Sequence, residues 1–126
     1  AMNQTPCPNC GWVHPNTVQV AATKRQRLAL VIQHVAMALG IEISEMRSAK
    51  RGRHIAEARQ LAMAVGRFET RLTFEEIGFA LNRDHTTVIH GIESTAARFE
   101  KDQQFRAIVR ANFPEFARSL ESKGAA

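Results

Sequence analysis

The chain has 126 residues, a formal net charge of +5 and a sequence pI of about 10.0, and 44% of its residues are apolar. This length predicts one folded domain with at most a small appendage, and a basic balance suits a polyanionic partner without identifying one. No apolar run approaches membrane-spanning length and no hydrophobic signal segment is present, so we expect a cytoplasmic protein with no membrane partner.

Residues 1–22 contain no Asp, Glu, Lys or Arg, hold three of the four prolines and show no helical period, so we expect a separate N-terminal segment. Within it, Cys7 and Cys10 flank Pro-Asn, and His14 follows four residues later, a spacing typical of zinc ligands. No second cysteine pair supplies a fourth ligand, for which His34, another chain and solvent are the candidates. A structural zinc, a flexible tail with free thiols and a redox pair all stay open for this segment.

The first helix is expected to begin after Thr23, an N-cap with Gln26 at the capping-box position, and to end at Gly40. Its apolar residues recur at helical spacing: Leu28, Val31, Ile32, Val35 and Leu39. A short helical turn is expected at about 44–48, followed by a basic loop at 49–53. Five basic residues against one acid lie between positions 47 and 59, so the positive charge is concentrated there.

A longer helix is predicted from about 54 to 69, because six apolar residues share one face: Ile55, Ala58, Leu61, Ala62, Val65 and Phe68. Arg59 and Arg67 are assigned to its polar side. Thr73 and Glu76 then form a capping box that opens a two-turn helix, and Asn82 can take the left-handed conformation that ends it.

Asp84 is predicted to cap the next helix, whose inward-facing residues are Val88, Ile89, Ile92, Ala96 and Phe99. A last helical segment begins near Asp102 and is broken at Pro114. No strand pattern competes. We therefore expect an all-α protein, a compact helical bundle over residues 23–121 with a flexible tail at 122–126.

The two helices joined through residues 81–83 fit a helix-turn-helix, in which the second helix enters the DNA major groove with its N-terminal residues foremost. Asp84, His85, Thr86 and Thr87 occupy that end. A carboxylate can accept from the cytosine amino group, a threonine offers a hydroxyl and a methyl, and an imidazole can donate. From spacing alone, a second interpretation stays open, in which Asp84 only caps the helix and the threonines are solvated.

A resemblance adds to this pattern. Ile77-Gly78 followed by Arg83-Asp84-His85-Thr86-Thr87-Val88-Ile89-His90 resembles the signature of the C-terminal DNA-binding domain (domain IV) of the DnaA chromosomal replication initiator family. Residues 48–51 resemble the family's basic loop, 58–64 the helix after it and 35–41 the helix before it. The resemblance covers about residues 24–120, and it implies a helix-turn-helix bundle of the Trp-repressor-like kind.

The resemblance also implies roles. Arg51 would enter the minor groove, while Asp84, His85, Thr86 and Thr87 would read bases in the major groove. The residues expected to bind phosphates are Lys50, Arg53, Arg59, Gln60, Arg67 and Arg83. The implied partner is double-stranded DNA carrying sites like the DnaA box, in replication initiation or transcription regulation, and no cofactor is expected to be required for this binding.

The sequence departs from the family in two ways. Leu81 and Asn82 stand where the family commonly has two glycines, and Leu81 cannot adopt a positive φ cheaply, so we expect a slightly different turn. No G-x-x-x-x-G-K-[ST] loop is present and there is no room for an ATPase domain. We therefore expect a DNA-binding module without catalysis, monomeric on one asymmetric site.

One rival function is a protein-interaction adaptor, in which the Cys/His segment binds a protein partner and the helical domain no longer reads DNA. An enzyme is the weakest option. His85 or His90 could act as a base near Asp84, but no nucleophile with a positioned base and no cofactor loop accompanies them.

Overall fold

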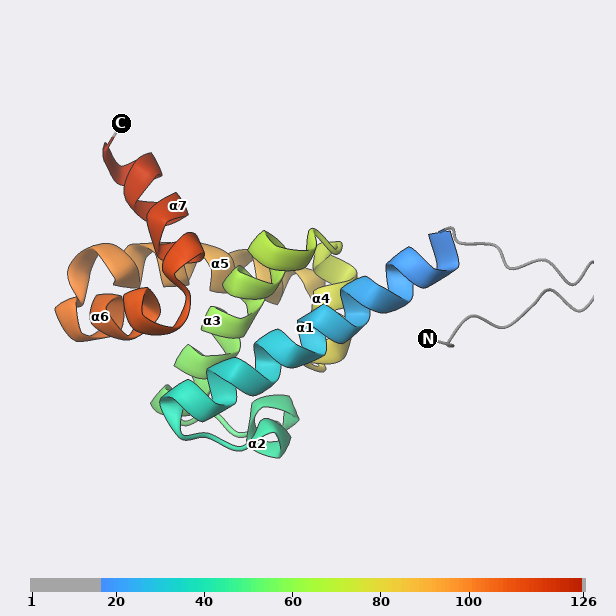
Figure 1. Cartoon of the computed structure of the whole chain (residues 1–126). Coiled ribbons are helices and arrows are strands. Elements are labelled where there is room, and N and C mark those ends of the chain that lie inside the picture. Colours follow the sequence, from blue (N-terminus) through green and yellow to red (C-terminus); the bar gives the residue numbers. More distant parts are fainter. Residues whose placement is uncertain (1–16, 126) are drawn as a thin grey trace, which may run out of the picture.

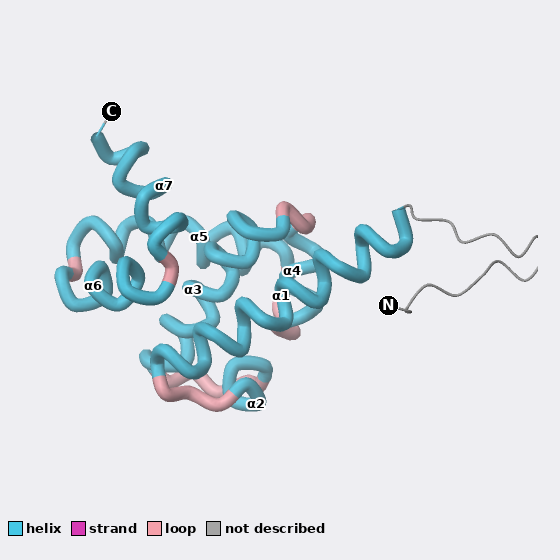
Figure 2. Tube along the Cα trace, in the orientation of Figure 1, coloured by secondary structure: helices cyan, strands magenta, loops and turns pink. Residues whose placement is uncertain are grey.

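The computed structural model describes residues 17–125, and within that range it contains seven helices and no strand. The helices are α1 (Thr17–Leu39), α2 (Ile43–Arg47), α3 (Arg53–Thr70), α4 (Phe74–Ala80), α5 (His85–Lys101), α6 (Gln103–Asn112) and α7 (Pro114–Ala125). Short loops join them (Figure 2). The expected all-α bundle is confirmed for this part of the chain.

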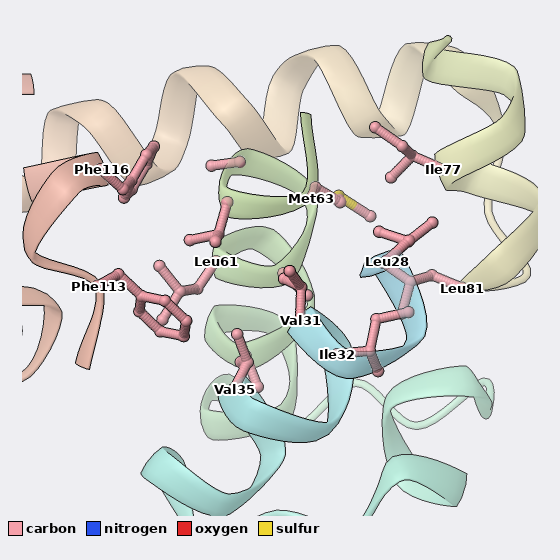
Figure 3. Close-up of a cluster of buried hydrophobic side chains, with 14 of the residues drawn as sticks. Leu28, Val31, Ile32, Val35, Leu61, Met63, Ile77, Leu81, Phe113 and Phe116 are labelled. Atoms are coloured by element: carbon pink, nitrogen blue, oxygen red, sulfur yellow. The ribbon is translucent and has the colours of Figure 1, made fainter. Parts of the chain in front are cut away.

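α3 is the central helix, and it packs against α1 on one side and α5 on the other (Figure 1). The three helices share one apolar core with residues of α2, α4, α6 and α7, part of which is drawn in Figure 3. Leu61, Val65 and Ile77 are completely buried, and each such side chain contributes about 1.5–3 kcal/mol through burial. Gly91 lets α5 approach α3 closely, because a Cβ at this position would lie 2.5 Å from the Met63 sulfur.

Two helix limits differ from the predictions. α1 begins at Thr17, ahead of the predicted N-cap Thr23, and so crosses the boundary placed after residue 22. The sequence between them, Val-Gln-Val-Ala-Ala, contains no glycine or proline that would stop a helix. α7 continues to Ala125, past the expected start of a flexible tail at residue 122, and it includes Gly124 near its end. The predicted break at Pro114 is confirmed, since α6 ends at Asn112 and α7 begins at that proline.

Candidate nucleic-acid interface

The first helix of the helix-turn-helix, α4, begins with the predicted capping box. The Thr73 hydroxyl accepts from the Glu76 N–H at 3.1 Å, and the Glu76 carboxylate accepts from the Thr73 N–H at 3.1 Å. At its other end, the Arg83 N–H donates to the Gly78 carbonyl oxygen at 2.7 Å. Position 78 requires glycine, because a Cβ there would lie 2.3 Å from the Arg83 carbonyl oxygen. The turn is therefore tightly defined.

The turn contains one left-handed residue where two glycines are common in the family. Asn82 has φ 57°, which confirms the prediction for this residue. Leu81 has φ −106°, so it avoids the left-handed region, and its side chain is completely buried. A leucine in place of glycine thus extends the core at the turn without backbone strain.

Asp84 caps α5. Its carboxylate accepts from the Thr86 N–H at 3.0 Å and also from the Thr86 hydroxyl. These hydrogen bonds lower the pKa of the Asp84 carboxyl, and the nearby His85 ring, with Nδ1 3.6 Å from Oδ1, favours the ionised form as well. The capping role is therefore present, and it leaves the side chains of all four residues, Asp84 to Thr87, exposed at the start of the helix.

The basic loop, predicted at 49–53, is formed in the structure by residues 48–52 between α2 and α3, and Arg53 is the first residue of α3. Arg51 is exposed, and so are Lys50 and Arg53 on either side of it. Lys50 Nζ lies 3.4 Å from a Glu45 carboxylate oxygen, and Arg53 Nε lies 3.4 Å from one of Glu57. Such exposed pairs are weak, so both cations could exchange their carboxylate for a phosphate at little cost.

Arg59 occupies a different position from the predicted one. It was placed on the polar side of α3, but only 7% of its surface is exposed. Its Nε donates to the Met46 carbonyl oxygen at 2.6 Å, and its Nη2 donates to those of Lys50 at 2.8 Å and Ser48 at 3.0 Å. Burial, together with the charge of Arg83, lowers the pKa of Arg59. The guanidinium is thus directed at the backbone of α2 and the basic loop.

Arg83 and Arg67 are also half-buried and bonded to the backbone. Arg83 Nη2 donates to the Ser48 carbonyl oxygen at 2.5 Å and Nη1 to that of Asn82 at 2.8 Å. Arg67 Nη1 donates to the Leu72 carbonyl oxygen at 2.6 Å. Phosphate binding by these arginines remains a prediction. In the folded structure, each guanidinium donates to backbone carbonyl oxygens of its own chain.

Gln60, the remaining residue predicted to bind phosphate, is half-buried on α3. Its side-chain oxygen accepts from Arg98 Nη1 of α5 at 3.3 Å. Gln60 therefore lies at the packing interface between α3 and α5.

The predicted zinc ligands Cys7, Cys10 and His14 lie outside the described residues, so zinc binding there remains a prediction. His34, the candidate fourth ligand, is described: its Nε2 lies 3.3 Å from the Asn112 side-chain oxygen, and its ring packs 4.4 Å from that of Phe113. Among residues 17–125, no group of three or more His, Cys, Asp and Glu side chains could hold a metal ion. Over the same residues, none of the helices has the length and apolar character of a membrane-spanning segment.

Known proteins match the region that carries this surface. A family model described as the bacterial DnaA protein helix-turn-helix matches residues 28–94. Over 91 residues, the chain is 37% identical to the chromosomal replication initiator protein DnaA of Chloroflexus aurantiacus, covering 70% of this chain and 19% of that protein. The proteins of the same name from Thermomicrobium roseum and Neisseria meningitidis are 39% and 41% identical over 83 and 76 residues, which are 65% and 60% of this chain and 18% and 15% of those proteins. The chain thus spans less than a fifth of the length of these relatives.

Proposed function

The chain belongs to the bacterial DnaA helix-turn-helix family, and from this premise we propose that it binds double-stranded DNA sequence-specifically at sites like the DnaA box. The observation that carries the proposal is the exposed start of α5, where Asp84, His85, Thr86 and Thr87 follow a tight helix-turn-helix turn. The relatives' name, chromosomal replication initiator, supports a role in replication initiation or its regulation.

In this proposal the start of α5 enters the major groove. His85 and Thr87 would contact base edges, and the Thr86 hydroxyl, which already donates to Asp84, keeps lone pairs that can accept from a base or from water. The free backbone N–H groups of the first helical turn would bind a phosphate.

The basic loop would contact the adjacent minor groove. Arg51 is exposed in the middle of the loop, and an arginine inserted into a narrow minor groove reads A·T-rich sequence through shape and potential. Lys50 and Arg53 would neutralise phosphates on either side, adding affinity without sequence preference. Neither contact involves catalysis, so we propose a binding function that needs no cofactor.

A titration of the whole chain by fluorescence anisotropy tests the proposal. One labelled duplex carries a DnaA box, and the other has the same composition in scrambled order, both at physiological salt. We expect the box duplex to bind tighter by on the order of 10³-fold. Equal affinities for the two duplexes would rule out sequence-specific reading.

The adaptor alternative gives the opposite pattern of variants. If residues 1–22 bind a protein partner and the bundle no longer reads DNA, deleting residues 1–22 abolishes partner binding. In that case Arg51→Ala leaves partner binding unchanged. The metal content of the chain, purified without chelator, tests the zinc prediction for Cys7, Cys10 and His14.

A further inference from the structure

We propose that Arg59 and Arg83 are positioning residues that hold the basic loop, and with it Arg51, in a set place relative to the start of α5. The inference rests on the proposed function and deepens it. It concerns how the basic loop and the start of α5 are held at a fixed relative position, so that both can contact one duplex. It also replaces direct phosphate binding as the main role of both arginines.

Arg59 joins the loop to α3. As a five-residue helix, α2 leaves carbonyl oxygens near its C-terminus without intrahelical partners. The planar guanidinium reaches the Met46 oxygen through Nε, at 2.6 Å, and the Lys50 oxygen through Nη2, at 2.8 Å. Lys50 is the residue immediately before Arg51, so this bond holds the backbone next to the proposed minor-groove side chain.

Arg83 joins the same loop to the helix-turn-helix. Its Nη2 donates to the Ser48 carbonyl oxygen, which also accepts from Arg59 Nη2 at 3.0 Å. The Arg83 backbone is itself held by its bond to Gly78 and lies directly before the cap Asp84. A continuous path of hydrogen bonds therefore runs from α3 through Ser48 to Arg83, the residue before the cap of α5.

The alternative role, phosphate binding by Arg59, fits the geometry less well. The side chain is buried, and both Nε and Nη2 are directed at carbonyl oxygens of its own chain, which leaves Nη1 as the remaining donor group. Phosphate binding and loop positioning predict different effects of replacing Arg59 by lysine. Lysine binds phosphate as a point charge, but it has no planar fork to reach several carbonyl oxygens at once.

A double-mutant cycle on the box duplex tests the inference, using Arg59→Lys, Arg51→Ala and the combination. If Arg59 acts by positioning Arg51, Arg59→Lys weakens binding by on the order of tenfold but has little further effect when Arg51 is already alanine. Arg118→Lys is the matched control, the same change at an exposed arginine on α7, outside the proposed DNA-binding surface, and it should bind as the wild type does. Losses that multiply in the double variant, or wild-type binding by Arg59→Lys, would overturn the inference.

Amide hydrogen exchange on the DNA-free protein gives a second readout. We expect Arg59→Lys to speed exchange at residues 48–52 while the protection of α5 stays unchanged, and unchanged exchange in the loop would contradict the positioning role. If Arg59→Lys fails to fold, Arg83→Lys carries both measurements from the other end of the path. If the wild-type protein has no preference for the box duplex, the proposed function is overturned. If the wild-type protein prefers the box but the affinity losses of the two single variants multiply in the double variant, only this inference is overturned.

Discussion

The Arg83 guanidinium donates a hydrogen bond to the Ser48 carbonyl oxygen at 2.5 Å, across 35 positions of the sequence. Arg83 belongs to the turn that places α5, and Ser48 begins the basic loop that carries Arg51. The bond therefore connects the two parts of the proposed DNA-binding surface directly, and most of the expected effects of mutation depend on whether a variant alters one part or the other.

Arg51→Ala should weaken binding to the box duplex by on the order of tenfold, because it removes the minor-groove contact and one cation. Anisotropy titrations over a range of salt concentrations measure both the affinity and the salt slope, which should become shallower. Arg118→Ala is the matched control. It removes the same charge from an exposed position on α7, a helix that packs on α6. If the two variants bind equally well, Arg51 has no special role.

Thr87→Ala should reduce the ratio of affinities for box and scrambled duplexes while leaving the scrambled affinity nearly unchanged, since base contacts carry specificity. The side chain is exposed, so the free energy of unfolding should change by no more than about 0.5 kcal/mol. Thr86→Ala differs, because it also removes the hydroxyl bond to Asp84 and should destabilise α5. A Thr87→Ala variant with full discrimination would remove this residue from the set that reads bases.

The cap of α5 should make stability depend on acid pH. The pKa of Asp84 is lowered in the folded protein by its hydrogen bonds with Thr86, so its contribution is fully present above the ordinary aspartate pKa. That contribution is lost as pH falls through the lowered value. Asp84→Asn keeps a good N-cap without the ionisable group and should lose this part of the pH dependence.

Urea unfolding of both proteins at neutral and at acid pH measures the difference, and an NMR titration of the Asp84 carboxyl carbon measures the pKa directly. Thr86→Ala should move that pKa upward, toward the ordinary value. An Asp84 pKa that does not respond to Thr86→Ala would contradict the described cap.

Thr95→Val should stabilise the protein by about 1 kcal/mol. Thr95 is completely buried on α5, and its hydroxyl is the buried side-chain polar atom without a hydrogen-bond partner among the described residues. Thr70→Val is the matched control, because the equally buried Thr70 hydroxyl donates to the Gly66 carbonyl oxygen at 2.7 Å and accepts from the Leu72 N–H. Urea unfolding should show opposite signs for the two variants, and destabilisation by Thr95→Val would mean that its hydroxyl has a partner.

Much of the fold follows from local sequence signals. The capping box at Thr73, the Asp84 cap, the left-handed Asn82 and the break at Pro114 are each determined by chemistry within a few residues, and the structure confirms all four. The predicted start of α1 was wrong, because it relied on Thr23, a polar residue that can cap a helix. Residues 18–22 contain no glycine or proline, and the helix begins before them, at Thr17.

The site was harder to predict because its arginines act over long range. The sequence prediction places Arg59 on the polar side of α3 as a phosphate-binding residue. Yet Arg59 lies four residues after Ile55 and three before Ala62, which places it beside the apolar face of the helix. That spacing was a signal that Arg59 could be buried. Its acceptors on Met46, Ser48 and Lys50 could not be foreseen, because the path of the loop over α3 depends on tertiary packing.

The most direct test of the DNA-binding surface is an NMR titration of the isotope-labelled protein with the box duplex. We expect the largest amide shift changes at residues 48–53 and 83–90, with α6 and α7 nearly unchanged, and much smaller changes at 83–90 with the scrambled duplex. The same changes with both duplexes, or changes centred on α6 and α7, would contradict sequence-specific reading by the basic loop and the start of α5.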